Sequence, residues 1–159
     1  MKSIMGFIFL FSISFSQPQL FSQDLEHLII EPGFNISIYA KNLDAPRQMA
    51  ESKDGTIFVG EKGGQIIALR DTDKNGQADF KRVIAKNLTL STGVSIYNGD
   101  IYFSEVSKIW KIENIENWLN TNPALKKEYP KKILVTDNLP NDTWHGLSLI
   151  HISEPTRPY

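Results

Sequence analysis

The chain of 159 residues contains no cysteine, and this absence excludes several kinds of chemistry at once. Disulfide bonds, Cys-ligated zinc, iron–sulfur clusters and thiol catalysis all need a cysteine sulfur. An exported protein of this size without disulfides must be held together by its hydrophobic core alone. That requirement suits a large β-protein better than a small cross-linked domain.

An excess of charge of one sign is also lacking. Seventeen Lys and Arg residues nearly balance 18 Asp and Glu residues, and the formal net charge is -1. No basic block of the nucleic-acid-binding type interrupts this balance. We therefore expect neither nucleic acid nor an anionic membrane surface as a partner.

The sequence has no apolar run long enough to span a bilayer. The longest, residues 4–15, is too short, but a positively charged start precedes it. Ser14 and Ser16 place small residues at the −3 and −1 positions of a cleavage site. Residues 1–16 are therefore predicted to be a secretory signal peptide, with a signal anchor or a buried strand as alternatives. A periplasmic or secreted protein without a stable membrane span follows, with residues 17–27 as a linker.

A short sequence motif that begins with Asn-Leu occurs three times along the chain. It begins at Asn42-Leu43, Asn87-Leu88 and Asn138-Leu139, so the starts lie 45 and 51 residues apart (42 to 87 and 87 to 138). In the first two copies a hairpin-like run follows and ends at Glu61 or Glu105. A period of roughly 40–50 residues of short strands is the size of one β-propeller blade.

Each of the first two repeats contains four strand-like runs separated by turn residues. Asn98-Gly99 is the sequence signal of a type I′ hairpin turn. A short helix is expected within residues 113–127, and a further strand at residues 34–39. The eight predicted strands of the repeats are residues 47–52, 56–61, 65–70, 80–85, 93–97, 100–105, 108–112 and 132–136.

These observations predict an all-β fold, a partial β-propeller of about two four-stranded blades plus the start of a third. Two such blades leave sheet edges open and the ring unclosed, so we expect the chain to be a piece of a larger ring. The predicted propeller part is residues 28–147. Residues 148–159 lack the hairpin signal of the earlier repeats and are expected to be a non-native tail.

Three places could carry chemistry. His145 falls near the start of the innermost strand of the third repeat, at the mouth of a propeller channel, where an imidazole can serve as a general base. Packing beside Trp144 is the alternative. Arg47 occupies the corresponding place in the first repeat and could pair with an anionic ligand or form a structural ion pair.

The third place is an acidic turn with oxygen-bearing side chains at alternate positions and a glycine at its bend. Such spacing resembles a calcium loop, although Arg82 stands where an EF-hand needs a bidentate Glu. The alternative is an acidic hairpin turn that uses Asx hydrogen bonds. The candidate metal ligands are Asp71, Asp73, Asn75 and Asp79.

In their order and spacing these segments together resemble the glucose/sorbosone dehydrogenase family, in particular its sorbosone dehydrogenase branch. The resemblance covers about residues 28–146. The segments that carry it are EPGF (31–34), LDAPR (43–47), DGTIFVGE (54–61), DTDKNGQAD (71–79), GDIYFSE (99–105), Leu139-Pro140 and His145-Gly146.

The resemblance implies a six-bladed propeller with pyrroloquinoline quinone (PQQ) as redox cofactor and calcium to polarise it. It also implies that His145 takes a proton from a sugar hydroxyl or hydrated aldehyde as hydride passes to the quinone. Trp144 stands where the glucose dehydrogenase branch has an Asp, and most ligands of the cofactor and calcium would lie beyond residue 159.

The chain is therefore predicted to be a fragment of a PQQ-dependent sugar or aldehyde dehydrogenase. The sequence does not identify the electron acceptor. Two other classes of propeller protein are the alternatives. One is a non-catalytic module that binds carbohydrate or protein, and the other is a calcium-dependent lactonase-like hydrolase.

Overall fold

The computed structural model describes residues 25, 28–91, 93–122 and 128–139. The chain divides into two compact units, Met1–Ile36 and Ser37–Tyr159. The described residues of the first unit form a turn at Gly33 but no strand. Both β-sheets belong to the second unit.

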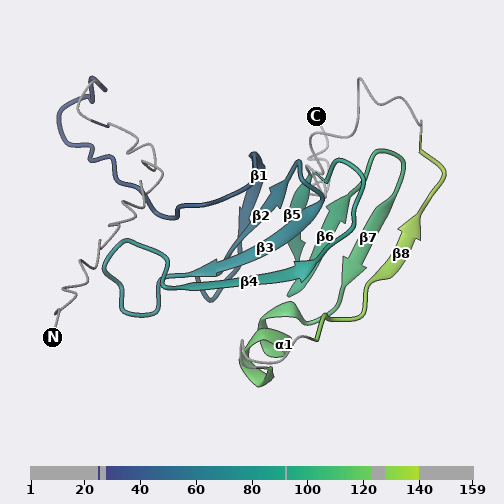
Figure 1. Ribbon diagram of the computed structural model, residues 1–159. Helices are drawn as coiled ribbons and strands as arrows, with labels where there is room; N and C mark the ends of the chain where they lie inside the picture. Colours follow the sequence, from purple (N-terminus) through teal and green to yellow (C-terminus); the bar gives the residue numbers. More distant parts are fainter. Residues whose placement is uncertain (1–24, 26–27, 92, 123–127, 140–159) are drawn as a thin grey trace, which may run out of the picture. The chain divides into compact units, whose positions relative to one another are not determined.

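Each sheet is an antiparallel meander of four strands in chain order (Figure 1). The two sequence repeats therefore correspond to the two sheets, and all eight predicted strands of the repeats are confirmed to within a few residues. The first sheet contains β1 (Pro46–Glu51), β2 (Ile57–Glu61), β3 (Gln65–Arg70) and β4 (Phe80–Ala85). The second contains β5 (Val94–Tyr97), β6 (Asp100–Ser104), β7 (Ile109–Ile112) and β8 (Ile133–Thr136), and the helix α1 (Ile115–Thr121) lies between β7 and β8 in the chain.

The hairpin between β5 and β6 shows how local sequence sets the register. Asn98 and Gly99 both have positive φ, 51° and 84°, as a type I′ turn requires. This turn places Tyr97 opposite Asp100 and Val94 opposite Phe103. The Asn-Gly signal therefore fixes which side chains of β5 and β6 face the first sheet.

The main hydrophobic core lies between the two sheets and includes side chains from both. Phe58 and Ile66 of the first sheet and Ile101 and Phe103 of the second are fully buried in one cluster. Ile115 of α1 joins the same cluster. Neither sheet buries this face by itself, which is the behaviour expected of neighbouring blades in a repeat protein.

The other face of the first sheet is covered by the chain that leads into it. Tyr39, Ala40 and Leu43 pack against a smaller buried cluster of Val59, Ile67 and Leu69. These residues lie before β1 and cross the sheet without pairing with a strand. They belong to the second unit together with the sheets.

The predicted strand at residues 34–39 is wrong. This segment has the alternating pattern of a strand, but the described residues offer it no strand to pair with, and no regular structure forms. The side chains of Phe34 and Ile36 remain 73% and 46% exposed. A strand needs backbone partners as well as an apolar face, and only the face is visible in the sequence.

β1 and β5 are the strands through which the two sheets meet most closely (Figure 1). Each is the first strand of its meander and lies at one end of its sheet. Two successive four-stranded meanders whose first strands lie together form a partial β-propeller, as the sequence predicted. β1 and β5 are therefore the innermost strands, and β4 and β8 are the outermost.

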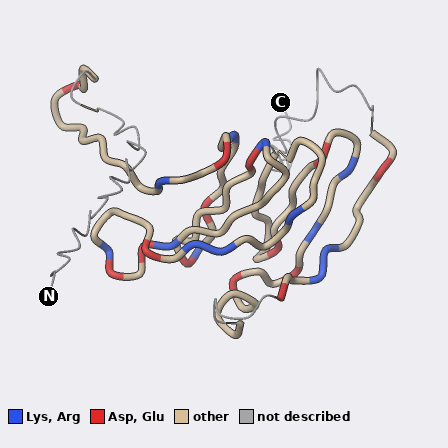
Figure 2. The backbone as a smooth tube through the Cα atoms, viewed as in Figure 1, with Lys and Arg blue, Asp and Glu red and all other residues tan. Residues whose placement is uncertain are grey.

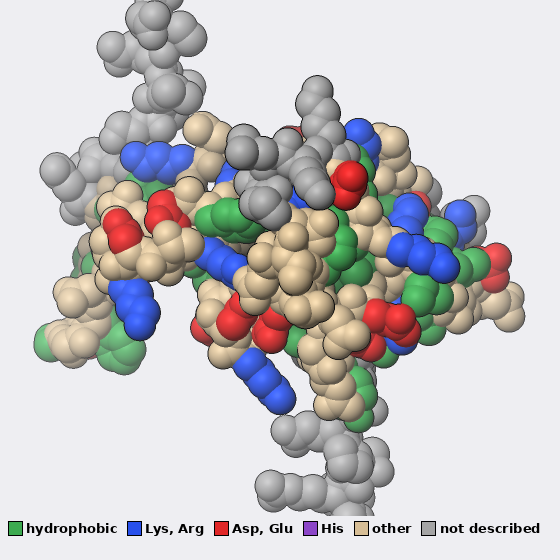
Figure 3. Space-filling view, turned by 90° about the horizontal axis from the view of Figure 1, so that it is seen from below, with side chains coloured by type: hydrophobic (Ala, Val, Ile, Leu, Met, Phe, Trp, Pro, Cys, Tyr) green, Lys and Arg blue, Asp and Glu red, His purple; other side chains and the backbone are tan. Residues whose placement is uncertain are grey.

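The surface carries both signs of charge. Figure 3 shows Lys and Arg side chains interspersed with Asp, Glu and apolar side chains on one face. Within the described residues, none of the helical structure is long and apolar enough to cross a membrane.

Candidate functional site

The repeated Asn-Leu motif forms the same backbone turn in both blades. Asn42 and Asn87 adopt the left-handed conformation, with φ of 58° and 57°. Three residues later Ala45 and Leu90 do the same, with φ of 48° and 51°. A non-glycine residue with positive φ is uncommon, so two in each repeat at equal spacing mark one turn used twice.

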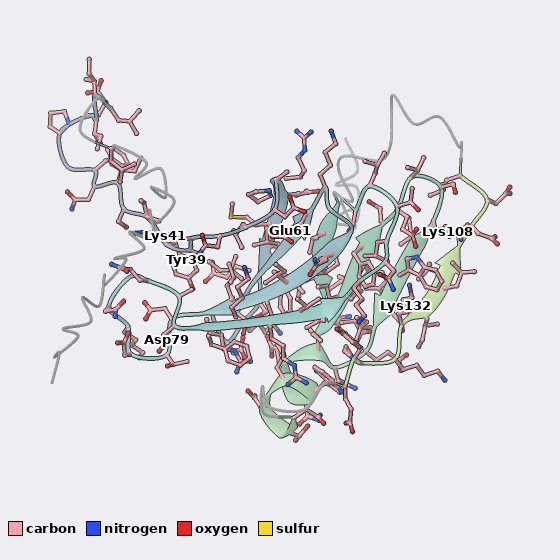
Figure 4. The ribbon with its side chains drawn as sticks, in the orientation of Figure 1. Tyr39, Lys41, Glu61, Asp79, Lys108 and Lys132 are labelled. Atoms are coloured by element: carbon pink, nitrogen blue, oxygen red, sulfur yellow. The ribbon has the colours of Figure 1, made fainter. Side chains whose placement is uncertain are left out.

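A glutamate holds this turn in both blades. Glu61, at the end of β2, accepts a hydrogen bond at Oε1 from the Asp44 backbone N–H at 2.8 Å. Glu105, one residue beyond β6, accepts at Oε2 from the Thr89 backbone N–H at 2.9 Å. The two glutamates therefore share one structural role in the two blades. Glu61 is only 2% exposed, and its position at the end of β2 is labelled in Figure 4.

The Asn-Leu motif also links each repeat to the preceding blade through a backbone hydrogen bond. The Leu88 N–H donates to the Gly64 carbonyl in the β2–β3 turn at 3.0 Å, and the Leu139 N–H donates to the Ser107 carbonyl at 3.4 Å. Gly64 has a φ of +86°, and a Cβ atom there would collide with the Leu88 carbonyl. A glycine is therefore required where the second repeat approaches the first.

These links bring the starts of the inner strands to one place. The Val94 N–H, at the start of β5, donates to the Gln48 side-chain oxygen in β1 at 3.4 Å. The start of β5 is also tied to β6, because the Gly93 N–H donates to Ser104 Oγ at 3.2 Å and the Gly93 carbonyl accepts from the Ser104 N–H at 3.0 Å. The start of β5 is thus tied to β1 through the Gln48 side chain and to β6 through Ser104, and the channel mouth itself stays a prediction.

Arg47, the predicted cofactor-binding residue, is the second residue of β1. The pairing between β1 and β2 is interrupted between Pro46 and Gln48, so Arg47 occupies a bulge and is exposed. None of the described carboxylates forms an ion pair with it. The cofactor-binding role of Arg47 stays a prediction.

One buried hydroxyl lies shortly before β5. Ser91 Oγ is fully buried and has no hydrogen-bond partner among the residues that the structure describes. It precedes β5 by three positions and lies in the loop that the Asn87 turn begins. The sequence contains no signal that distinguishes it from other serines.

The predicted base, His145, lies outside the described residues, and so do Trp144 and Gly146. Asn138 and Leu139, which open the third repeat, are described, and Leu139 makes the same kind of link to the preceding blade as Leu88 does. The position of His145 at the channel mouth therefore stays a prediction.

The acidic loop between β3 and β4 brings three of its four predicted metal ligands around one turn. The Asn75 N–H donates to both Asp71 Oδ1 and Asp73 Oδ1, at 3.1 and 3.2 Å. The Gly76 N–H donates to Asp71 Oδ2 at 2.7 Å. Figure 2 shows the acidic residues gathered in this loop.

Asp79 is attached to the other side of the same loop. It accepts hydrogen bonds from the backbone N–H of Thr72 at 2.9 Å and from the Thr72 hydroxyl. The Ala78 N–H donates to the Tyr39 carbonyl at 2.7 Å, and Figure 4 shows Tyr39 and Asp79 in this region. The loop is therefore organised by hydrogen bonds to its own carboxylates.

These hydrogen bonds shift the pKa values of the loop. Desolvation works to raise the pKa of Asp71, but the backbone N–H groups of Gly76 and Asn75 outweigh it and lower that pKa. The Thr72 hydroxyl and N–H lower the pKa of Asp79. Burial, followed by the negative charge of Asp71, raises the pKa of Tyr39. Both carboxylates are thus ionised at neutral pH, as a cation site would need.

The described part of the chain contains no group of three or more His, Cys, Asp or Glu side chains placed to hold a metal ion. A carboxylate has about four lone-pair sites, so hydrogen bonds to loop amides leave acceptor capacity for a cation. The oxygen donors of the loop fit calcium in kind, and the metal-binding role stays a prediction.

Sequence reasoning missed a polar network that joins the first blade to the helix of the second. Arg70 donates to Asp54 Oδ2 and to Asn120 Oδ1 in α1, both at 2.7 Å. Burial works to raise the pKa of Asp54, but hydrogen bonds from Thr56 and Ser52 and the charge of Arg70 together lower it. The DGT motif around Asp54 was visible in the sequence, but the hydrogen bond from Arg70 to Asn120 in α1, 50 positions further on (70 to 120), was not.

No protein-family model matches the chain. It is 29% identical over 116 residues to an uncharacterized protein of Borreliella burgdorferi, a match that covers 72% of this chain and 29% of that protein.

Among solved structures, it is similar to the iodide structure of a Trichoderma reesei carbohydrate-active enzyme of family AA12, with 21% identity and a TM-score of 0.49 over 65% of this chain and 26% of that one. It is also similar to the holo form of the pyranose dehydrogenase PQQ domain from Coprinopsis cinerea, with 15% identity and a TM-score of 0.47 over 64% of this chain and 23% of that one. The chain thus spans less than a third of the length of each of these proteins.

Proposed function

We propose that the chain forms the first blades of a longer, exported propeller that oxidises a sugar hydroxyl or a hydrated aldehyde with PQQ. The observation that supports this most is the repeated Asn-Leu motif, together with the contact between β1 and β5 near their starts. The order of motifs along residues 28–146, which resembles that of glucose/sorbosone dehydrogenases, supplies the chemical class.

Arg47 and His145 have separate roles in this proposal. PQQ, when bound, supplies the acceptor of two electrons. Arg47, exposed at the mouth and without an ion pair among the described residues, would hold one of the quinone carboxylates through its forked donors. His145 would accept the substrate hydroxyl proton while hydride leaves the neighbouring carbon.

The proposal also includes a calcium site within this chain, apart from the calcium that the resemblance implies beside PQQ. The side-chain oxygens of the loop between β3 and β4 are hard ligands of the kind that calcium prefers. The predicted ligands are Asp71, Asp73, Asn75 and Asp79. This loop lies on the β3–β4 connection, away from the inner-strand starts along the chain, so binding there would stabilise the blade rather than enter the reaction.

The test is reconstitution of the complete protein with PQQ and calcium. Reduction of an artificial electron acceptor is followed with a panel of aldoses and aldehydes. Turnover that requires PQQ supports the proposal. No turnover by folded, PQQ-treated protein would favour a carbohydrate- or protein-binding propeller, and calcium-dependent ester hydrolysis without PQQ would favour a lactonase-like enzyme.

The role of His145 is tested by replacement. His145→Ala should lower the rate by about 10²–10⁴-fold, because a positioned general base contributes that much. His27→Ala is the matched control and should leave the rate unchanged, because His27 precedes the propeller part of the sequence. An unchanged rate in the His145 variant would remove the base from the proposal but leave the dehydrogenase intact.

A further inference from the structure

The outermost strand of the second sheet, β8, leaves apolar side chains uncovered. Leu134 and Val135 are 43% and 50% exposed. β8 pairs with β7 on one side, and none of the described residues pairs with its other edge. A strand edge with open backbone groups and exposed apolar side chains is a site for pairing with another strand.

The outermost strand of the first sheet, β4, is different. Ile84 and Ala85 near its end are 1% and 5% exposed, so little apolar surface is left to cover. Arg82 in its middle is only 6% exposed and donates to the backbone carbonyls of Asn122 and Glu128, so residues that follow α1 already lie against this strand. Of the two outermost strands, only β8 is suited to self-association.

The two ends of the β8 segment carry opposite charges. The sequence from Lys132 to Asp137 reads Lys-Ile-Leu-Val-Thr-Asp, with a cation at one end and an anion at the other. Both end residues are exposed, and Figure 2 shows β8 running from a basic to an acidic segment. In an antiparallel pair of two such strands, each Lys132 meets the Asp137 of the other copy.

A bulge in β8 places Lys132 and Asp137 on the same face of the sheet. Ile133 pairs with Lys111 and Thr136 with Ile109, so one residue of β8 is extra and Leu134 and Val135 together stand opposite Trp110. Lys111 and Ile109 are two positions apart and share a face, so Ile133 and Thr136 share it too. Lys132 directly precedes Ile133 and Asp137 directly follows Thr136, so both lie on the opposite face of the sheet.

Lys132 lies on the face of the sheet that this pairing assigns to it. Its Nζ is 4.3 Å from the centre of the Trp110 ring, which is on the same face as Leu134. Figure 4 shows Lys132 at the beginning of β8. Asp137 makes no ion pair with any other described residue, so its carboxylate is available to a second copy.

We propose that β8 is a dimerisation strand that pairs antiparallel with β8 of a second copy about a two-fold axis through Leu134 and Val135. The pairing joins the second sheets of two chains into one eight-stranded sheet and covers the exposed apolar pair of each. Two Lys132–Asp137 contacts close its ends, because an isologous interface uses every contact twice. The outermost strand lies at the rim of a propeller, so the interface leaves the channel mouth open.

Sedimentation velocity of the chain over a range of concentrations tests this directly. The wild type should show a monomer–dimer equilibrium. Asp137→Lys should weaken it by at least about tenfold, because two attractive cross-strand contacts become repulsive. The double variant Lys132→Asp/Asp137→Lys restores opposite charges across the axis and should recover the dimer.

Glu51→Lys is the matched control, since it reverses one exposed carboxylate on a strand of the other sheet and should leave the equilibrium unchanged. Circular dichroism of each variant shows whether the sheets are retained. Hydrogen exchange should slow at the amides of β8 as the protein concentration rises. A monomer at every concentration up to about 1 mM, or a dimer that Asp137→Lys leaves intact, would overturn the proposal.

Discussion

At the residue scale, the most informative side chain is a buried carboxylate with a purely structural task. Glu61 fixes the backbone N–H of Asp44 in the turn before β1, and Glu105 does the same for Thr89 before β5. Glu105 also accepts a hydrogen bond from the Trp110 indole at 2.6 Å. A glutamate in a propeller blade near a channel could be mistaken for a catalytic acid, but these hydrogen bonds assign it to the turn.

Replacing Glu61 by Ala should lower the free energy of unfolding by about 1–3 kcal/mol, because the Asp44 N–H loses its acceptor next to a buried site. Glu61→Gln is the matched control and should cost less, since its side-chain oxygen can still accept the bond. Urea denaturation of the three proteins measures both values. An equal loss in the two variants would show that the charge of Glu61, rather than the acceptor, stabilises the turn.

At the element scale, the sequence predicted what local chemistry controls. Asn98-Gly99 specified its turn, and alternating apolar residues between turn signals located the eight strands of the two sheets. Contacts that join distant elements were not predictable. Arg82, for example, lies 4.3 Å from the Trp118 ring centre and donates to the Glu128 carbonyl at 3.2 Å, and no local pattern pairs these residues.

The same limit explains the wrong strand and the untested parts of the site. Residues 34–39 have a strand pattern, but a strand forms only with a partner whose identity depends on the tertiary fold. Arg47 could be placed on the inner strand from the repeat alone, whereas its exposure and lack of an ion pair among the described residues come from a bulge in β1. Repeats reveal position, and packing decides what a side chain at that position can reach.

The loop between β3 and β4 should bind calcium weakly. Its exposed carboxylates and the amide of Asn75 suit a site with a dissociation constant of about 10⁻⁴–10⁻³ M, the range of extracellular calcium modules. Asp71→Asn should weaken binding by at least about tenfold, because it removes one ligand charge. Isothermal titration with calcium measures the constants, and Asp100→Asn serves as the control. Failure of calcium to saturate the wild type would show that the loop is a hydrogen-bonded turn only.

At the scale of the whole molecule, the two sheets should unfold together because they share one core. Phe58 of β2 is fully buried in the cluster that also contains Ile101 and Phe103 of β6. Phe58→Ala should therefore cost about 3–5 kcal/mol, a loss expected when a large buried side chain leaves a cavity. The backbone amides of both sheets should lose protection against hydrogen exchange by the same amount, because a blade cannot keep its inner face buried without its neighbour.

Native-state hydrogen exchange distinguishes this cooperative behaviour from independent blades. Amides of β3 report on the first sheet and amides of β6 on the second. Met49→Ala, at an exposed side chain of β1, is the control and should change stability by no more than about 0.5 kcal/mol. If Phe58→Ala lowered protection in β3 but left β6 unchanged, the second sheet would be stable alone. The Asn-Leu links between blades would then position the channel mouth without coupling the stability of the two sheets.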